Sequence, residues 1–249
     1  MSKEENIFAE CICKKDIKVK TVLVGFPGMG LTGSIASSHM SEQLEFETVG
    51  YIKGTAIPPV SVFLDGYLRY PYRIMGKEGK DIAIFIGESA VSPQGAYHMA
   101  QAITRWTEKH GASEIITLDG FGYMNKDDEG KVYMVAEPEI KKRAEKIDIP
   151  PLKSGYITGF AGAILNEAII SDLDGYALLV GTRPELPDPG GAAELVQAIN
   201  KLKGFDIDVE SLLEQAETIK KKLAELADQA KQMRQEGASP RGKPSTYYT

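Results

Sequence analysis

The stretch VLVGFPGMGLTGSIA, residues 22–36, constrains the fold more than any other part of the chain. An aliphatic, β-branched run ends in Gly25, and Gly28, Gly30 and Gly33 follow with the spacing G-x-G-x-x-G. At the end of a buried strand, this spacing is typical of a tight turn into a helix, because glycines let the helix backbone approach the strand closely. The chain is therefore expected to build an α/β fold around this strand–turn–helix unit.

Further strands and helices alternate along the chain. Short apolar runs rich in β-branched residues predict strands at residues 17–25, 48–56, 60–66, 81–87, 113–121, 131–137 and 175–182. Helices are expected to end near Leu44, at Gly111 and at Gly204, where glycines or polar turns follow an amphipathic segment. Such alternation indicates a mostly parallel sheet covered on both faces. Residues 115–137 resemble a hairpin, which predicts that the sheet is mixed.

The composition excludes several function classes. With 249 residues, of which 43% are apolar, the chain can form one large α/β domain with an appendage. A net charge of -6 argues against a nucleic-acid partner. No apolar run approaches the roughly 20 residues that span a bilayer, and the first ten residues lack the apolar core of a signal peptide, so a cytoplasmic protein is expected. Cys11 and Cys13 have neither the separation for a disulfide nor histidines nearby for a zinc site.

The glycine turn meets only part of a dinucleotide-binding pattern. That pattern needs an acidic residue at the end of the second strand, whereas TVGYIKG ends in Lys53 and Gly54. Pro27 also removes one amide that would face a phosphate. Lys53 leaves NADP, with its 2′-phosphate, as an open alternative, but close packing of helix on strand is the favoured interpretation.

Other motifs also fall short of a catalytic or metal site. IGESAVS (86–92) approaches the nucleophile pattern G-x-S-x-G, but its fifth position is Val91, and no histidine follows His110 to act as the late base. NKDDEGKVYMVAE begins like a calcium-binding loop, but its twelfth position is Ala136. In GYITGFAGAIL (155–165) the glycines indicate close backbone packing. We therefore predict no catalytic residue, no metal ligand and no cofactor.

The C-terminal part of the chain differs from the rest. Apolar residues recur at steps of three and four over residues 206–236, namely Val209, Leu212, Ala216, Ile219, Leu223, Leu226, Ala230 and Met233. Such a stripe needs a partner helix, in the same chain or in a neighbouring subunit. The candidates for oligomer contacts are Leu212, Ile219, Leu223 and Leu226. Residues 237–249 show no periodicity and are rich in Gly, Pro and Ser, so a flexible tail is expected after a body at 1–205 and a helix at 206–236.

Several segments, in their order along residues 17–230, resemble the archaeal form of the proteasome assembly chaperone family, the family of the second proteasome assembly chaperone. They are VGFPGMGLTGSIASSHMSEQL, IPPVSVFLDGYLRYP, DIAIFIGESAVSPQGAYHMAQAITRWTEKHGASEIITLDGF, GFAGAIL and YALLVGTRPELPDPGGAAELVQAINKL. The resemblance implies a three-layer α/β/α sandwich similar to nucleoside phosphorylases, followed by C-terminal helices. It also implies a homo-oligomer without a known catalytic site, whose partner is the proteasome α-ring, and a structural role for the glycine turn.

The last three residues carry the most specific functional signal. Proteins that dock on the α-ring end in a hydrophobic residue, tyrosine and any residue, and Tyr247, Tyr248 and Thr249 match that pattern. The sequence thus predicts a non-enzymatic assembly chaperone or scaffold that binds proteasome α subunits or the core particle. Two alternatives stay open: a small-molecule or nucleotide-binding enzyme of phosphorylase-like fold that uses the turn at 25–33, and a self-assembling scaffold with a different client.

Overall fold

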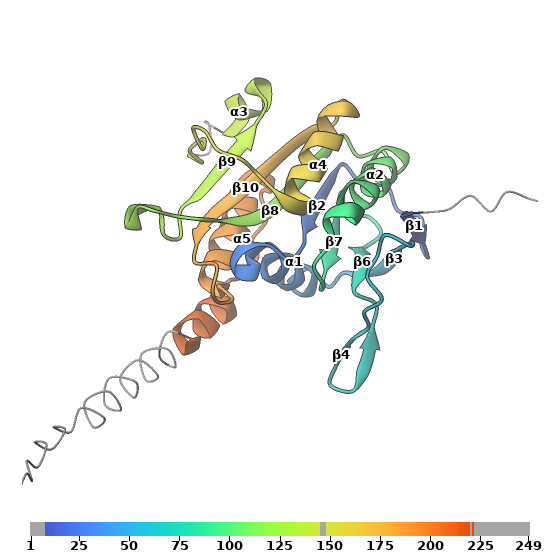
Figure 1. The fold of residues 1–249 in the computed structure, drawn as a ribbon, viewed down its shortest axis with the longest axis horizontal. Coiled ribbons are helices and arrows are strands. Elements are labelled where there is room, and N and C mark those ends of the chain that lie inside the picture. The colour runs from blue at the N-terminus through green and yellow to red at the C-terminus, as the bar shows by residue number, and fades with distance from the viewer. Residues whose placement is uncertain (1–7, 145–147, 220, 222–249) are drawn as a thin grey trace, which may run out of the picture.

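A mixed sheet of eight strands forms the centre of the molecule, in a computed structural model that describes residues 8–144, 148–219 and 221 (Figure 1). In spatial order β1-β3-β6-β7-β2-β8-β10-β9, the strands are β1 (Glu10–Cys13), β3 (Glu47–Lys53), β6 (Tyr72–Gly76), β7 (Ile82–Gly87), β2 (Thr21–Gly25), β8 (Glu114–Gly122), β10 (Asp174–Thr182) and β9 (Val132–Ala136). Strands β7, β2, β8 and β10 are parallel, and the outer strands are antiparallel to their neighbours.

Helices cover both faces of this sheet. Helices α1 (Thr32–Gln43) and α5 (Pro189–Lys203) pack on one face, and α2 (Pro93–Lys109) and α4 (Gly159–Ile170) on the other (Figure 1). The central strands are apolar throughout because successive side chains point to opposite faces, and both faces are covered. In β2, for example, Val22 and Val24 join the core under α2, while Leu23 joins the core under α1. The predicted α/β fold with a mixed sheet is confirmed as a three-layer α/β/α sandwich.

Local signals fix the ends of α2 and α5. The side chain of Ser92 accepts a hydrogen bond from the Gly95 amide at the start of α2, and that of Asp188 accepts one from the Gly191 amide at the start of α5. In each helix the first residue is a proline. Gly204 ends α5 with a φ of 69°, in the left-handed region that favours glycine. A shorter helix, α3 (Pro138–Ala144), packs beside β9.

The predicted hairpin at 115–137 is wrong. Strands β8 and β9 are not neighbours, because β10 lies between them, parallel to β8 and antiparallel to β9. The predicted strand at 60–66 is also not part of the main sheet: β4 (Val62–Leu64) pairs with β5 (Tyr67–Arg69) in a separate two-stranded sheet. The sequence interpretation did not anticipate β1, β5, β6 or α4, and the predicted strand 17–25 begins only at Thr21.

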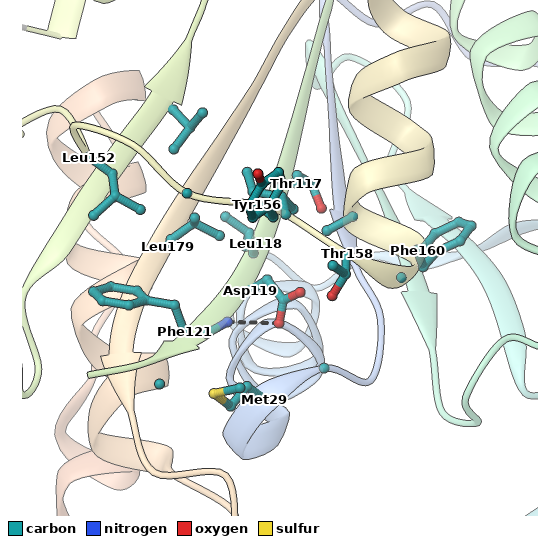
Figure 2. Close-up of a pocket in the computed structure, with 18 of the residues that line it drawn as sticks. Met29, Thr117, Leu118, Asp119, Phe121, Leu152, Tyr156, Thr158, Phe160 and Leu179 are labelled. Carbon is teal, nitrogen blue, oxygen red and sulfur yellow. Dashed lines mark hydrogen bonds between the residues drawn. The ribbon is translucent and has the colours of Figure 1, made fainter. Parts of the chain in front are cut away.

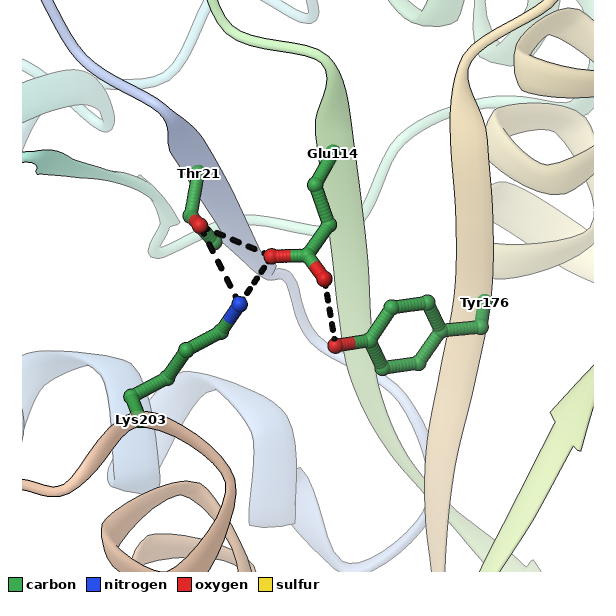
Figure 3. A network of polar contacts seen from close by, with 4 residues as sticks. All are labelled: Thr21, Glu114, Tyr176 and Lys203. Carbon is green, nitrogen blue, oxygen red and sulfur yellow. Dashed lines mark hydrogen bonds and ion pairs between the residues drawn. The ribbon is translucent and has the colours of Figure 1, made fainter. Parts of the chain in front are cut away.

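A polar network at the amino ends of the central strands ties α5 to the sheet (Figure 3). Lys203, in the last turn of α5, pairs with Glu114 of β8. Thr21 of β2 donates to the same carboxylate over 2.7 Å, and the Tyr176 hydroxyl of β10 donates to its other oxygen over 3.0 Å. A largely buried carboxylate needs such partners, because leaving its charge unpaired away from water would be costly.

A last helix begins at Glu210, and the side chain of Asp208 accepts a hydrogen bond from the Glu210 amide over 2.9 Å. The structure describes this C-terminal helix through residue 219 and again at 221. None of the helices in the described ranges is long and apolar enough to cross a bilayer.

Candidate functional site

The glycine turn brings the start of α1 against the centre of the sheet. A Cβ on Gly33 would lie 2.0 Å from the Leu118 carbonyl oxygen of β8, and a Cβ on Gly25 would lie 2.3 Å from the Gly33 carbonyl oxygen. Both distances are far below van der Waals contact, so only glycine fits at these positions. Gly30 has a φ of 63° within the short 3-10 helix η1 (Met29–Leu31) that precedes α1.

Asp119 fills the space that Gly28 leaves open. This carboxylate follows Leu118 near the end of β8, and a Cβ on Gly28 would lie 2.0 Å from its Oδ1. It accepts a hydrogen bond from the Gly120 amide over 2.7 Å (Figure 2) and another from the Met29 amide. In a dinucleotide-binding turn, amides at the start of the helix bind a phosphate oxygen. Here the protein's own carboxylate takes that place.

Burial raises the pKa of Asp119 to about 6, against its ordinary value of 3.8, while the amides of Gly120 and Met29 oppose this rise. At pH 7 the carboxylate is therefore still mostly charged. A phosphate approaching the turn would meet a negative charge rather than free amides. This arrangement disfavours the interpretation of residues 25–33 as a nucleotide or NADP site.

A cavity of about 880 Å³ opens beside Asp119, at the carboxyl ends of β2 and β8 (Figure 2). After β2 the chain continues into α1 on one face of the sheet, whereas the connection from β9 to β10 runs through α4 on the other face. Open α/β sheets commonly bind ligands where neighbouring connections pass to opposite faces. Its lining is mainly apolar, including Met29, Phe121, Tyr156 and Phe160. Among the residues that line it, Asp119 is the one carboxylate and Lys153 the one cation, without a histidine or cysteine. The hydroxyl groups of Thr117, Ser154 and Thr158 also line the cavity.

The three histidines all have structural partners. The Nε2 of His39 lies 2.6 Å from the Asp208 carbonyl oxygen, and the Nδ1 of His110 lies 2.7 Å from that of Trp106. His98 stacks on Phe8. No group of three potential metal ligands occurs in the part of the chain that the structure describes.

The family model for the PAC2 family matches residues 22–227, most of the chain. This chain belongs to the PAC2 family. The resemblance that the sequence motifs indicated is thereby confirmed.

Two solved structures and one further archaeal protein are similar to this chain over most of their length. PbaA of Pyrococcus furiosus, described as an archaeal homolog of proteasome-assembly chaperone, is 31% identical, with a TM-score of 0.82 over 92% of this chain and 96% of that chain. An uncharacterised protein of Methanocaldococcus jannaschii, MJ1210, is 32% identical over 78% of each chain. PbaB of P. furiosus, described as an archaeal proteasome activator, shares the fold, with a TM-score of 0.80, 20% identity and coverage of 89% of this chain and 99% of that chain.

Two of the four predicted oligomer-contact residues of this PAC2 chain fall in the described ranges. Leu212 is only 2% exposed and packs in the core under α1 and α5, so its own chain already covers it. Leu212 thus packs as in the alternative that the stripe contacts elements of its own chain, and it anchors the C-terminal helix to the body. Ile219 is half-buried and lines a groove between that helix and the loop from β10 to α5, together with Leu213 and Ala216. Five predicted site residues lie outside the described residues: Leu223, Leu226, Tyr247, Tyr248 and Thr249.

Asp119 is the site residue that sequence reasoning missed. The signal was present in the segment EIITLDGF, where an acidic residue directly follows the apolar centre of the strand. The glycine pattern directs attention to an acidic residue after the second strand in sequence. The carboxylate that meets the turn comes instead from the spatial neighbour of β2.

Proposed function

We propose that this PAC2 protein is a non-enzymatic proteasome assembly chaperone or proteasome-interacting scaffold. The observation that carries the proposal is the similarity to PbaA, an archaeal homolog of proteasome-assembly chaperone, at 31% identity over 92% of the chain. A cytoplasmic location and self-association belong to the same proposal.

The proposal that the protein is not an enzyme is supported by the structural hydrogen bonds of the side chains that could act as an acid or a base. Asp119 accepts amides of the turn, and His39 and His110 bond backbone carbonyl oxygens. The cavity beside Asp119 offers apolar area and one carboxylate, which suits binding better than bond cleavage.

Docking on the α-ring is assigned to the last three residues, within a division of the chain into a body (1–205), a helix (206–236) and a tail (237–249). Tyr247 would supply apolar area and the Tyr248 ring would fill a pocket between α subunits. The carboxylate of Thr249 would pair with a lysine at the rim of that pocket, a charge-assisted bond of about 1.5–3 kcal/mol. The tail from Gly237 can extend about 45 Å at most. Several tails on one oligomer would raise the effective concentration of each.

The deciding experiment compares the full chain with a chain that ends at Thr246, and measures the binding of each to purified α-rings and to assembled core particles. We expect the full chain to bind and the shortened chain to lose binding while its thermal unfolding stays unchanged. Tyr97→Ala, which removes an exposed tyrosine of α2, is the matched control and should bind like the full chain. Equal binding by the shortened chain would refute docking through the tail, and no binding by the full chain would refute the α-ring as partner.

A further inference from the structure

Cys13, at the end of the edge strand β1, lies against the C-terminal end of α2. Trp106 and His110 are four residues apart and therefore share the face of α2 that packs on this strand. The Trp106 Nε1 donates to the Cys13 Sγ over 3.1 Å, and the His110 Nε2 lies 3.5 Å from the same sulfur. The sequence interpretation found no histidine near this cysteine, since His110 follows it by 97 residues, but the fold brings the two side chains together.

The hydrogen bonds of His110 determine which of its ring nitrogens can accept a proton. Its Nδ1 lies 2.7 Å from the Trp106 carbonyl oxygen, and because a carbonyl oxygen only accepts, Nδ1 carries the proton of the neutral ring. Nε2 is then left with a lone pair that faces the Cys13 sulfur. The ring is buried and stacks on the Trp106 indole with centroids 3.9 Å apart, so its orientation is fixed. His110 can therefore take the proton of the Cys13 thiol.

Two further groups favour this proton transfer. The Trp106 Nε1–H is a donor only, so the hydrogen bond that it makes to the sulfur becomes stronger when the sulfur is a thiolate. A proton on Nε2 would also face the Asp16 Oδ1, which lies 3.4 Å away. Thiolate is the nucleophilic form of cysteine, and a neighbouring histidine is a common means of forming it. Because Cys13 is exposed, a small reagent can reach it from solvent.

Cys11 lies two residues earlier on the same face of β1 and has the opposite environment. Its thiol donates to the Ala102 carbonyl oxygen over 3.4 Å, one helical turn before Trp106, and a thiol that donates keeps its proton. Burial raises the pKa of the Cys11 thiol, and the neighbouring Cys13 adds to this rise. One strand thus carries a cysteine paired with a base and a second cysteine held as the thiol.

We propose that Cys13 is a site of oxidation by peroxides, with His110 as the base that activates it. The thiol proton passes to the His110 Nε2, and the thiolate attacks one oxygen of the peroxide. The S–O bond forms as the O–O bond breaks, and the leaving oxygen takes the proton from Nε2, as water when the oxidant is hydrogen peroxide. The sulfur loses two electrons, which reduce the peroxide, and Cys13 becomes a sulfenic acid that thiols can reduce again. This stoichiometric modification goes beyond the proposed function and requires no proteasome.

The test treats the folded, full-length protein with hydrogen peroxide in the presence of dimedone, which traps sulfenic acids, and locates the adduct by peptide mass spectrometry. We expect one adduct, at Cys13, formed about tenfold faster than at the same cysteine in urea-unfolded protein, and none at Cys11 over the same time. Trp106 is the single tryptophan of the chain, so its fluorescence should change at the rate of the oxidation. Equal rates in the folded and unfolded protein, or equal modification of Cys11, would overturn the proposal.

His110→Asn tests the base separately from packing. An asparagine amide can still donate to the Trp106 carbonyl oxygen but brings no basic nitrogen to the sulfur, so oxidation of Cys13 should slow about tenfold with retained circular dichroism. Trp106→Phe keeps a ring in the core without the N–H donor and should also slow the oxidation. Cys11→Ser is the matched control, and its Cys13 should react at the wild-type rate. Wild-type rates in both folded α2 variants would show that the cluster does not activate Cys13.

Discussion

At the scale of single residues, Asp119 shows how a ligand-binding turn can be converted into a structural one. The carboxylate accepts the Gly120 and Met29 amides and fills the space beside Gly28. The turn keeps the glycine spacing of an anion site, while a side chain of the same chain supplies the anion. Glycine spacing therefore identifies the backbone geometry of such a turn but not its occupant.

This environment makes a pH-dependent prediction for Asp119. Its pKa is about 6 in the fold and 3.8 ordinarily, so folding favours the protonated acid. The resulting stabilisation is present below pH 4 and is lost as the pH rises through 6, by at most about 3 kcal/mol. Asp119→Asn keeps an oxygen that accepts hydrogen bonds but carries no titrating charge. Since only the wild type loses this stabilisation as the pH rises, the free energy of unfolding of the variant, relative to that of the wild type, should increase from pH 4 to pH 7.

Urea unfolding at several pH values measures this difference. Asp206→Asn, at an exposed position, is the matched control and should keep a constant offset from wild type. An Asp119→Asn variant whose offset is equally constant would contradict the proposed cost of burying this carboxylate.

At the scale of elements, close approach of α1 to β8 depends on Gly33. A methyl group there would lie 2.0 Å from the Leu118 carbonyl oxygen, and backbone atoms on both sides cannot rotate away. We expect Gly33→Ala to lower the free energy of unfolding by about 3 kcal/mol, as for overpacked core positions. Gly155→Ala is the control, since a Cβ there meets no atom within 4 Å. Denaturant unfolding of both variants measures the effect, and similar stability for the two would be inconsistent with this packing.

Elements with strong local signals could be predicted from the sequence, and those set by distant partners could not. The caps of α2 and α5 and the apolar runs of β2 and β7 are local, and the structure has them at the expected places. The neighbour of β8 is decided by pairing with β10, whose sequence lies far downstream, so the sequence favoured the nearer β9. Helix α4 was missed because GFAGAILNEAII lacks an amphipathic pattern. Likewise, Asp119 meets the turn only because β8 lies beside β2.

At the scale of the whole molecule, we expect two different roles for the apolar stripe of the C-terminal segment. Leu212 packs within the body, so Leu212→Ala should cost about 2–5 kcal/mol of subunit stability. Leu223 and Leu226 continue the stripe, and their replacement by Glu should instead weaken the oligomer with little change in thermal unfolding. Analytical ultracentrifugation and calorimetry separate the two effects. An intact oligomer in the Leu223→Glu, Leu226→Glu variant would show that the distal stripe is not a subunit contact.

The strand order has a consequence for synthesis on the ribosome. Strand β9 emerges before β10, yet it joins the sheet through β10, and residues 137–173 must be made in between. During that interval the edge of β9 that pairs with β10 has no sheet neighbour, and an unpaired strand edge can associate with another nascent chain. Translation speed over this interval therefore bears on the yield of folded protein, and a pause after β9 would be more harmful than one after β10.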